Sequence, residues 1–136
     1  MKRKINVSKV LKGFDGEVMQ VNTEKYDDKN LPILKDRTLQ STLITYMRMA
    51  HRIKMSDENR NVAYILGTLI GQATGQVTLT TEQYDVLKEI VDNGRARDQK
   101  NQEEDVFPIE ISKQVKKMVD EAEIVEETIV EEKQAE

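Results

Sequence analysis

Residues 75–94 read Gly-Gln-Val-Thr-Leu-Thr-Thr-Glu-Gln-Tyr-Asp-Val-Leu-Lys-Glu-Ile-Val-Asp-Asn-Gly. Val77 and Leu79 alternate with polar neighbours, which predicts a short strand with one buried face. Thr80 or Thr81 then provides an N-cap, because a threonine hydroxyl accepts a hydrogen bond from a free backbone N–H at a helix start. The helix predicted next buries residues at the spacing of one helical face: Tyr84, Leu87, Ile90 and Val91. The glycine of Asn93-Gly94 ends this helix.

Two further helices are predicted upstream of this unit. Asp36 caps the first, whose apolar positions recur every three or four residues: Leu39, Leu43, Met47, Ala50 and Ile53. Ser56 caps the second, and Gly75 ends it. Its predicted buried face comprises Val62, Ile65, Leu66, Leu69, Ile70 and Ala73. Each helix therefore has an apolar stripe to bury against the rest of a core.

The N-terminal residues are predicted to form a β-hairpin over residues 4–22. Asp15-Gly16 lies between two groups of β-branched and apolar residues, and Asp-Gly in that setting is a strong signal for a hairpin turn. Residues 22–35 are polar, contain Pro32, and are predicted to be a loop with a short extended piece at residues 31–34. The expected fold class is α+β, with the N-terminal hairpin and a short third strand packed on three helices within residues 1–94.

The chain beyond residue 94 differs in composition. Residues 1–94 carry 14 basic and 12 acidic side chains, whereas residues 95–136 carry 7 basic and 13 acidic ones. Residues 95–105 are almost entirely polar and are predicted to be a linker. Residues 106–136 are predicted to be an acidic extension, either helical or disordered.

An apolar stripe at heptad-like spacing runs through this extension. It comprises Ile111, Val115, Met118, Ala122, Val125 and Ile129, and Phe107 precedes it as a plausible anchor. Lysines lie near the start of this segment and glutamates near its end, which opposes the helix dipole, so an isolated helix here would be marginal. Three interpretations stay open: a disordered tail, a segment that folds onto a protein partner, and self-association. These seven apolar residues are the predicted protein-binding site.

Small residues recur every four positions on the second predicted helix, at Ala63, Gly67 and Gly71. Glycine inside a helix costs about 1 kcal/mol relative to alanine, so Gly67 and Gly71 need a structural reason. Close packing against the first helix or the sheet is one explanation. A groove that a second copy contacts is another, and a ligand site is a third.

The composition excludes several classes of protein. The chain has 136 residues, a net charge of -4, no Cys and a single His, so disulfides, thiolate metal sites and His-rich metal sites are excluded. No apolar run is long enough to span a bilayer, and no signal peptide is recognisable. We expect no cofactor, no metal, no enzyme activity and no membrane partner. Nucleic-acid binding is disfavoured because the chain is acidic overall and poor in aromatic residues.

Three stretches resemble small accessory proteins of tailed bacteriophages. They are residues 4–17 around Asp15-Gly16, Thr38-Leu39 at the opening of a helix, and residues 77–91. The resemblance covers about residues 4–92. It implies a phage or prophage origin and a non-enzymatic role, and it assigns no functional residue.

The sequence therefore predicts a non-enzymatic phage accessory protein that binds a host or phage protein, as a modulator or inhibitor. Docking would use the C-terminal amphipathic segment, as an amphipathic helix in a groove. The alternative is a self-associating virion component, such as a tail or head assembly factor. The expected location is the cytoplasm of the host cell, or the virion under the alternative.

Overall fold

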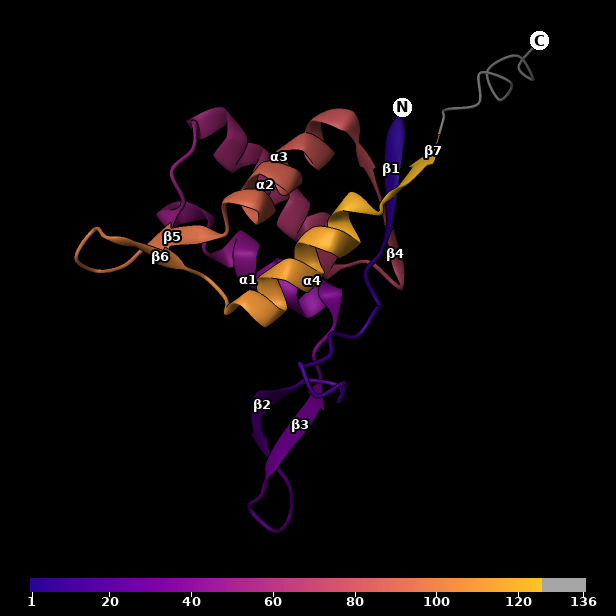
Figure 1. The fold of residues 1–136 in the computed structure, drawn as a ribbon, viewed down its shortest axis with the longest axis vertical. Coiled ribbons are helices and arrows are strands. Elements are labelled where there is room, and N and C mark those ends of the chain that lie inside the picture. The colour runs from indigo at the N-terminus through magenta and orange to yellow at the C-terminus, as the bar shows by residue number, and fades with distance from the viewer. Residues whose placement is uncertain (126–136) are drawn as a thin grey trace.

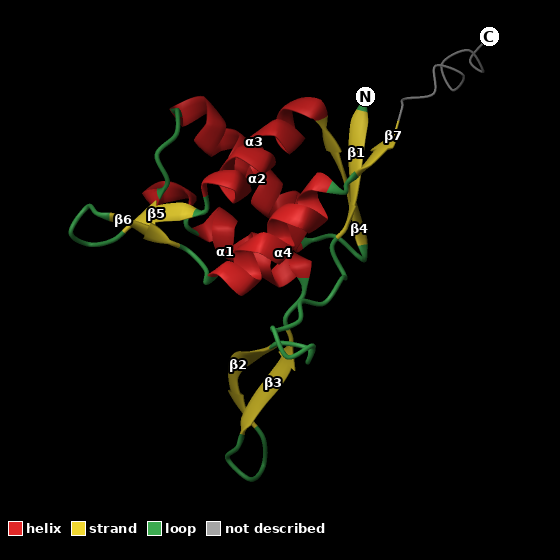
Figure 2. Cartoon of the chain, in the orientation of Figure 1, coloured by secondary structure: helices red, strands yellow, loops and turns green. Residues whose placement is uncertain are grey.

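Helices occupy the centre of the molecule and short strands lie around them, as a computed structural model of the chain shows (Figure 1). The structure describes residues 1–125 and is a mixed α+β fold (Figure 2). Its helices are α1 (Leu39–Arg48), the short 3-10 helix η1 (Ala50–Arg52), α2 (Asp57–Gly71), α3 (Thr81–Asn93) and α4 (Ile109–Asp120). Its strands are β1 (Lys2–Asn6), β2 (Gln20–Tyr26), β3 (Pro32–Asp36), β4 (Gln76–Thr80), β5 (Arg95–Arg97), β6 (Glu103–Asp105) and β7 (Glu123–Val125). The predicted α+β class is confirmed.

The strand and helix predicted within residues 75–94 are confirmed as β4 and α3. Val77 and Leu79 are buried on β4 while their neighbours are exposed. The Thr80 hydroxyl accepts a hydrogen bond from the N–H of Gln83, and the Gln83 side chain accepts one from the N–H of Thr80, so a capping box starts α3. Gly94 ends the helix with φ +64, a left-handed conformation that glycine adopts without strain.

The two upstream helices are present, with differences in detail. The cap of α1 is Thr38 and not the predicted Asp36, because the Thr38 hydroxyl accepts from the N–H of Ser41. Ser56 caps α2 as predicted. Ile65 and Leu69 were expected in the buried face of α2, yet they are 47% and 37% exposed. The buried face of α2 is narrower than predicted and consists of Val62, Ala63, Leu66 and Ile70.

The predicted hairpin over residues 4–22 is wrong. β1 pairs antiparallel with β4, with Ile5 opposite Val77, and not with residues that follow it closely. A tight turn does form at Asp15-Gly16, but the only pairing across it is an isolated bridge between Lys12 and Val18. Long-range burial of Ile5 beside β4 therefore outweighs the local turn signal.

Two hairpins occupy stretches that were predicted to be irregular. β2 and β3 pair antiparallel across the predicted loop, and β5 and β6 pair across the predicted linker of residues 95–105. Both hairpins turn on the same pattern, Asp-x-Lys-Asn, at residues 27–30 and 98–101. In each turn the aspartate carboxylate accepts two backbone N–H bonds, and the asparagine has a positive φ, +60 at Asn30 and +62 at Asn101. Asparagine tolerates this conformation better than other residues with a Cβ.

Residues 106–125, the described part of the predicted extension, do not form a separate unit. Their helix, α4, buries Ile111, Val115 and Val119 in the same core as α1, α2 and α3. The buried Tyr84 hydroxyl of α3 donates to the Val119 carbonyl at 2.8 Å, and burial raises the pKa of Tyr84. The hydrophobic core therefore does not divide at residue 94, because the first three helices leave a face that α4 covers.

β7 then returns beside β1 and completes a three-stranded sheet in the order β4-β1-β7. Val125 lies opposite Lys2 and Glu123 opposite Lys4, so β1 is the central strand. At the other end of α4, the Gln114 and Glu110 side chains accept the backbone N–H groups of Lys12 and Phe14. Both ends of α4 are thus fixed to the N-terminal segment.

Replacement of Val115 by alanine tests whether α4 belongs to the core. Val115 is fully buried, so V115A should lower the free energy of unfolding by about 2 kcal/mol through lost burial and the cavity left behind. Ile109 lies on the same helix and is 62% exposed, so I109A should change the free energy of unfolding by less than about 0.5 kcal/mol. Urea unfolding of the two variants measures both changes in free energy. Equal destabilisation by V115A and I109A would contradict a buried α4.

Candidate protein-binding surface

The predicted docking residues that lie on α4 face inward. Ile111 and Val115 are buried in the core, and Met118 and Ala122 are half-buried against it. Val125 lies on β7 beside β1, and Ile129 lies outside the described residues. Ile111, Val115 and Met118 therefore share one face of α4, and that face packs on the protein's own helices. Within residues 109–120, this face is not open to a partner in the folded chain.

Phe107 contributes to a small cluster at the start of α4. Its ring meets that of Tyr46 edge-on, with the ring centroids 5.1 Å apart, and the Arg37 guanidinium lies 5.5 Å from its centroid. Burial, with a smaller contribution from the Asp105 carboxylate, raises the pKa of Tyr46 to about 12. Burial also lowers the pKa of Arg37. Phe107 thus connects α4 to α1 and holds Arg37 partly away from water.

The small-residue stripe on α2 lies against α1. Ala63 is fully buried, and a Cβ added at Gly67 would lie 3.4 Å from the Cβ of Met47. A Cβ at Gly71 would lie 3.3 Å from the terminal Cδ1 of Ile44. Of the explanations that the sequence left open, packing against the first helix is the one these contacts fit.

The same stripe also lines a broad groove at the base of the β2–β3 hairpin, which we call the arm groove. Its volume is about 1110 Å³, above the range of about 300–1000 Å³ typical of small-molecule sites. One wall is the hairpin base at residues 20–22, Lys35 and Arg37, and the other is formed by α1 and α2. Apolar and aromatic lining is provided by Val21, Ile44, Met47, Tyr64 and Phe107.

The charge in the arm groove has one sign. Lys35, Arg37 and Arg48 line it, and its lining contains no aspartate or glutamate. None of these three side chains forms an ion pair with a carboxylate among residues 1–125. Arg37 is half-buried, and desolvating a cation without a carboxylate partner is costly. The groove therefore favours an anionic occupant.

A second surface is the β2–β3 hairpin itself, which projects from the helical body (Figure 1). We call residues 20–36 the arm. All five residues of β3 are exposed, including Ile33 at 41% and Leu34 at 54%. Tyr26 and Leu31 near the turn are 59% and 56% exposed. The cross-strand register places Tyr26, Pro32 and Leu34 on one face of the hairpin, and alternation places Ile33 on the other.

Sequence reasoning missed the arm because residues 22–35 are polar on average. Two signals were present. The Asp27-x-Lys-Asn30 turn recurs as Asp98-x-Lys-Asn101, and an aspartate at the first position followed by asparagine at the left-handed position is turn chemistry. Apolar Tyr26 and Leu31 flank the first of these turns.

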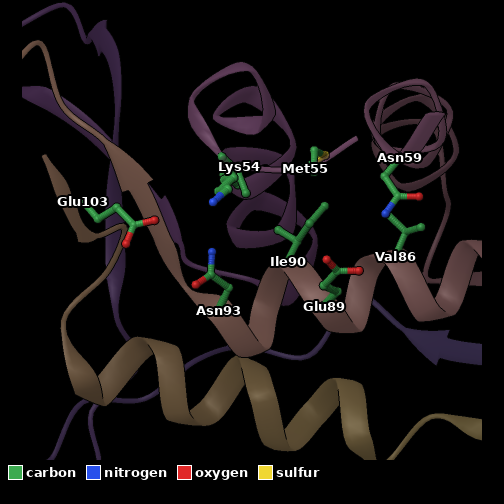
Figure 3. Close-up of a pocket in the computed structure, with 9 residues that line it drawn as sticks. Lys54, Met55, Asn59, Val86, Glu89, Ile90, Asn93 and Glu103 are labelled. Carbon is green, nitrogen blue, oxygen red and sulfur yellow. The ribbon is translucent and has the colours of Figure 1, made fainter. Parts of the chain in front are cut away.

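A smaller pocket lies between α2, α3 and the β5–β6 hairpin (Figure 3). Its volume is about 210 Å³, and Figure 3 shows Lys54, Asn93 and Glu103 around it, with Ile90 on the α3 side. This volume is below the range typical of drug-sized ligands. Within residues 1–125, no group of three or more His, Asp or Glu side chains is placed to hold a metal ion. No helix in that range has both the length and the apolar character needed to cross a membrane.

Comparison of the chain with protein-family models, with curated proteins and with solved structures found no match.

Two alanine substitutions test the account of the glycines. Because a methyl group at Gly67 would make only ordinary contact with Met47, G67A should raise the free energy of unfolding by about 0.5–1 kcal/mol through helix propensity. Gly75 has open space around it but φ +84, so G75A should lower the free energy of unfolding by about 1 kcal/mol. Thermal unfolding measures the stability of G67A and of G75A against the native chain. Loss of stability in G67A would mean that α1 and α2 pack more tightly than these distances indicate.

Proposed function

We propose that this chain is a non-enzymatic accessory protein of bacteriophage type that binds a host or phage protein through its arm. The observation that carries the proposal is the exposure of β3. Ile33 and Leu34 lie on opposite faces of this strand, and both are open to solvent. The phage assignment follows from the resemblance of residues 4–92 to small phage accessory proteins.

A partner protein would stabilise an arm of this kind. A two-stranded hairpin with no core on either face is only marginally stable by itself in water. The outer edge of β3 also leaves backbone N–H and C=O groups without a neighbouring strand, because among residues 1–125 β3 pairs with β2 alone. Binding would bury the apolar side chains and pair this edge, which is the recognition mode of strand addition.

The partner surface is expected to be apolar. The arm carries four acidic and three basic side chains, so its charge is nearly balanced and gives little electrostatic preference. Tyr26 and Leu31 at the tip are the expected anchors, because large apolar side chains near the centre of an interface contribute most of the binding free energy. A shallow apolar groove on the partner protein fits such a tip.

The docking surface thereby moves from the C-terminal segment to the arm. Ile111 and Val115 are committed to the core, and exposing them would unfold α4. The arm residues make no comparable contribution to the core. A modulator or inhibitor that docks through the arm can bind a partner without giving up its own fold.

Self-association in a particle remains the alternative function, and the uncompensated positive charge of the arm groove favours it. Under this alternative the protein is a virion or assembly component, and its partner is another copy of the chain.

Partner capture with arm variants tests the proposal. The tagged full chain is used to capture proteins from lysates of a bacterial host, with and without phage infection, and mass spectrometry identifies what it retains. The double variant Y26S/L31S should capture at least tenfold less of the partner than the native chain, because it removes both anchors and leaves the core intact.

The matched control is I109S, which also removes one exposed apolar side chain but lies on α4, away from the arm. It should capture the partner as well as the native chain does. In the captured complex, amides of residues 20–36 should gain protection from hydrogen exchange. Equal capture by Y26S/L31S and the native chain would contradict the proposal that the arm is the protein-binding surface.

A further inference from the structure

The arm groove combines features that point to one kind of occupant. Its three cations are Lys35, Arg37 and Arg48, with no carboxylate in the lining. The same groove is also lined by the apolar and aromatic side chains of Ile44, Met47 and Tyr64. An occupant that complements this surface carries several negative charges and a few apolar side chains, and is longer than a small molecule.

We propose that the arm groove binds the acidic C-terminal segment, residues 126–136, of a second copy of this chain. That segment reads Glu-Glu-Thr-Ile-Val-Glu-Glu-Lys-Gln-Ala-Glu, with five glutamates against a single lysine. The pair Ile129-Val130 lies between two pairs of glutamates. This combination of carboxylates and apolar side chains complements a groove lined by three cations and by apolar side chains.

The direction of β7 explains why the occupant comes from another copy. β7 runs antiparallel to β1, so its last residue, Val125, lies opposite Lys2 at the outer end of β1. Figure 1 shows this end of the sheet beside the N-terminus, at the opposite end of the molecule from the arm. The point at which residues 126–136 begin therefore lies far from the groove of their own chain, and the proposal assigns them to the groove of a neighbouring copy.

Such a contact joins two different surfaces of the protein. The terminal segment of one copy meets the groove of the next, so a pair joined by one such contact retains one free groove and one free segment. Further contacts of this heterologous kind extend the assembly into rings or open chains, and two copies that exchange segments with each other close a dimer. The inference gives a mechanism for the self-associating alternative, and it depends on the groove and not on the tip of the arm.

Charge reversal in the full chain tests the proposal. The groove variant K35E/R48E changes two exposed cations, and the segment variant E131K/E132K changes two of the glutamates. Sedimentation velocity over a concentration series at low salt measures assembly. The native chain should assemble, and each variant alone should assemble at least tenfold more weakly. In each variant the groove and the segment then carry charges of the same sign at the changed positions, and these charges repel.

Mixing the two variants restores both pairings. The native segment of the groove variant meets the native groove of the segment variant, and the two reversed surfaces also attract each other. The mixture should therefore assemble at concentrations where neither variant does alone. Raising the salt concentration should weaken assembly of the native chain, because the groove charges are partly exposed and are screened.

The matched control is K25E/K29E, which makes the same change in net charge on the arm outside the groove lining. It should assemble as the native chain does, and so should the arm-tip variant Y26S/L31S. A native chain that stays monomeric at all concentrations would overturn the inference, as would a mixture that fails to recover assembly. Because partner capture by the arm tip is measured with other variants, either proposal can fail while the other holds.

Discussion

The structure depends on the position of β1 between β4 and β7. β1 joins segments that are far apart in the sequence, with Lys4 opposite Thr78 on one side and Glu123 on the other. This pairing brings the start of the chain, its middle and residues 123–125 into one sheet beside the helices. It also sets where α4 lies, because α4 ends immediately before β7. The contacts of α4 with Tyr84 and with the segment at Lys12 and Phe14 then fix the helix across the open face of the core.

The helical part of the fold was accessible from the sequence, and the strand pairing was not. Local signals placed the helices: Ser56 and Thr80 as caps, Gly94 as the stop, and apolar residues at helical spacing. The stripe in residues 111–122 was also recognised, but periodicity gives only the existence of an apolar face and not what covers it. The pairing of β1 with β4 joins residues at least 70 positions apart, and no local pattern encodes it. A turn does form at Asp15-Gly16, but the predicted hairpin strands on either side of it do not.

The same distinction holds for the candidate surfaces. Ala63, Gly67 and Gly71 were identified from their spacing, and their packing against α1 was among the explanations considered. The groove that they help to line was not predictable, because its other wall comes from the arm. Lys35 and Arg37 come to line the same groove as Arg48, the last residue of α1, only because the arm lies beside α1. The arm, with its exposed apolar side chains, is thus separate from the core, whereas the groove joins arm residues to core residues such as Met47 and Ala63.

Hydrogen exchange of the full chain, resolved by residue, tests most directly the claim that the C-terminal segment completes the core. The amides of Val115 and Val119 in α4 should exchange only through global unfolding, with the same free energy of opening as Leu66 in α2 and Ile5 in β1, because all four residues are buried in one core. If Val115 and Val119 exchange by a local opening while Leu66 stays protected, α4 is a detachable appendage and the account is wrong.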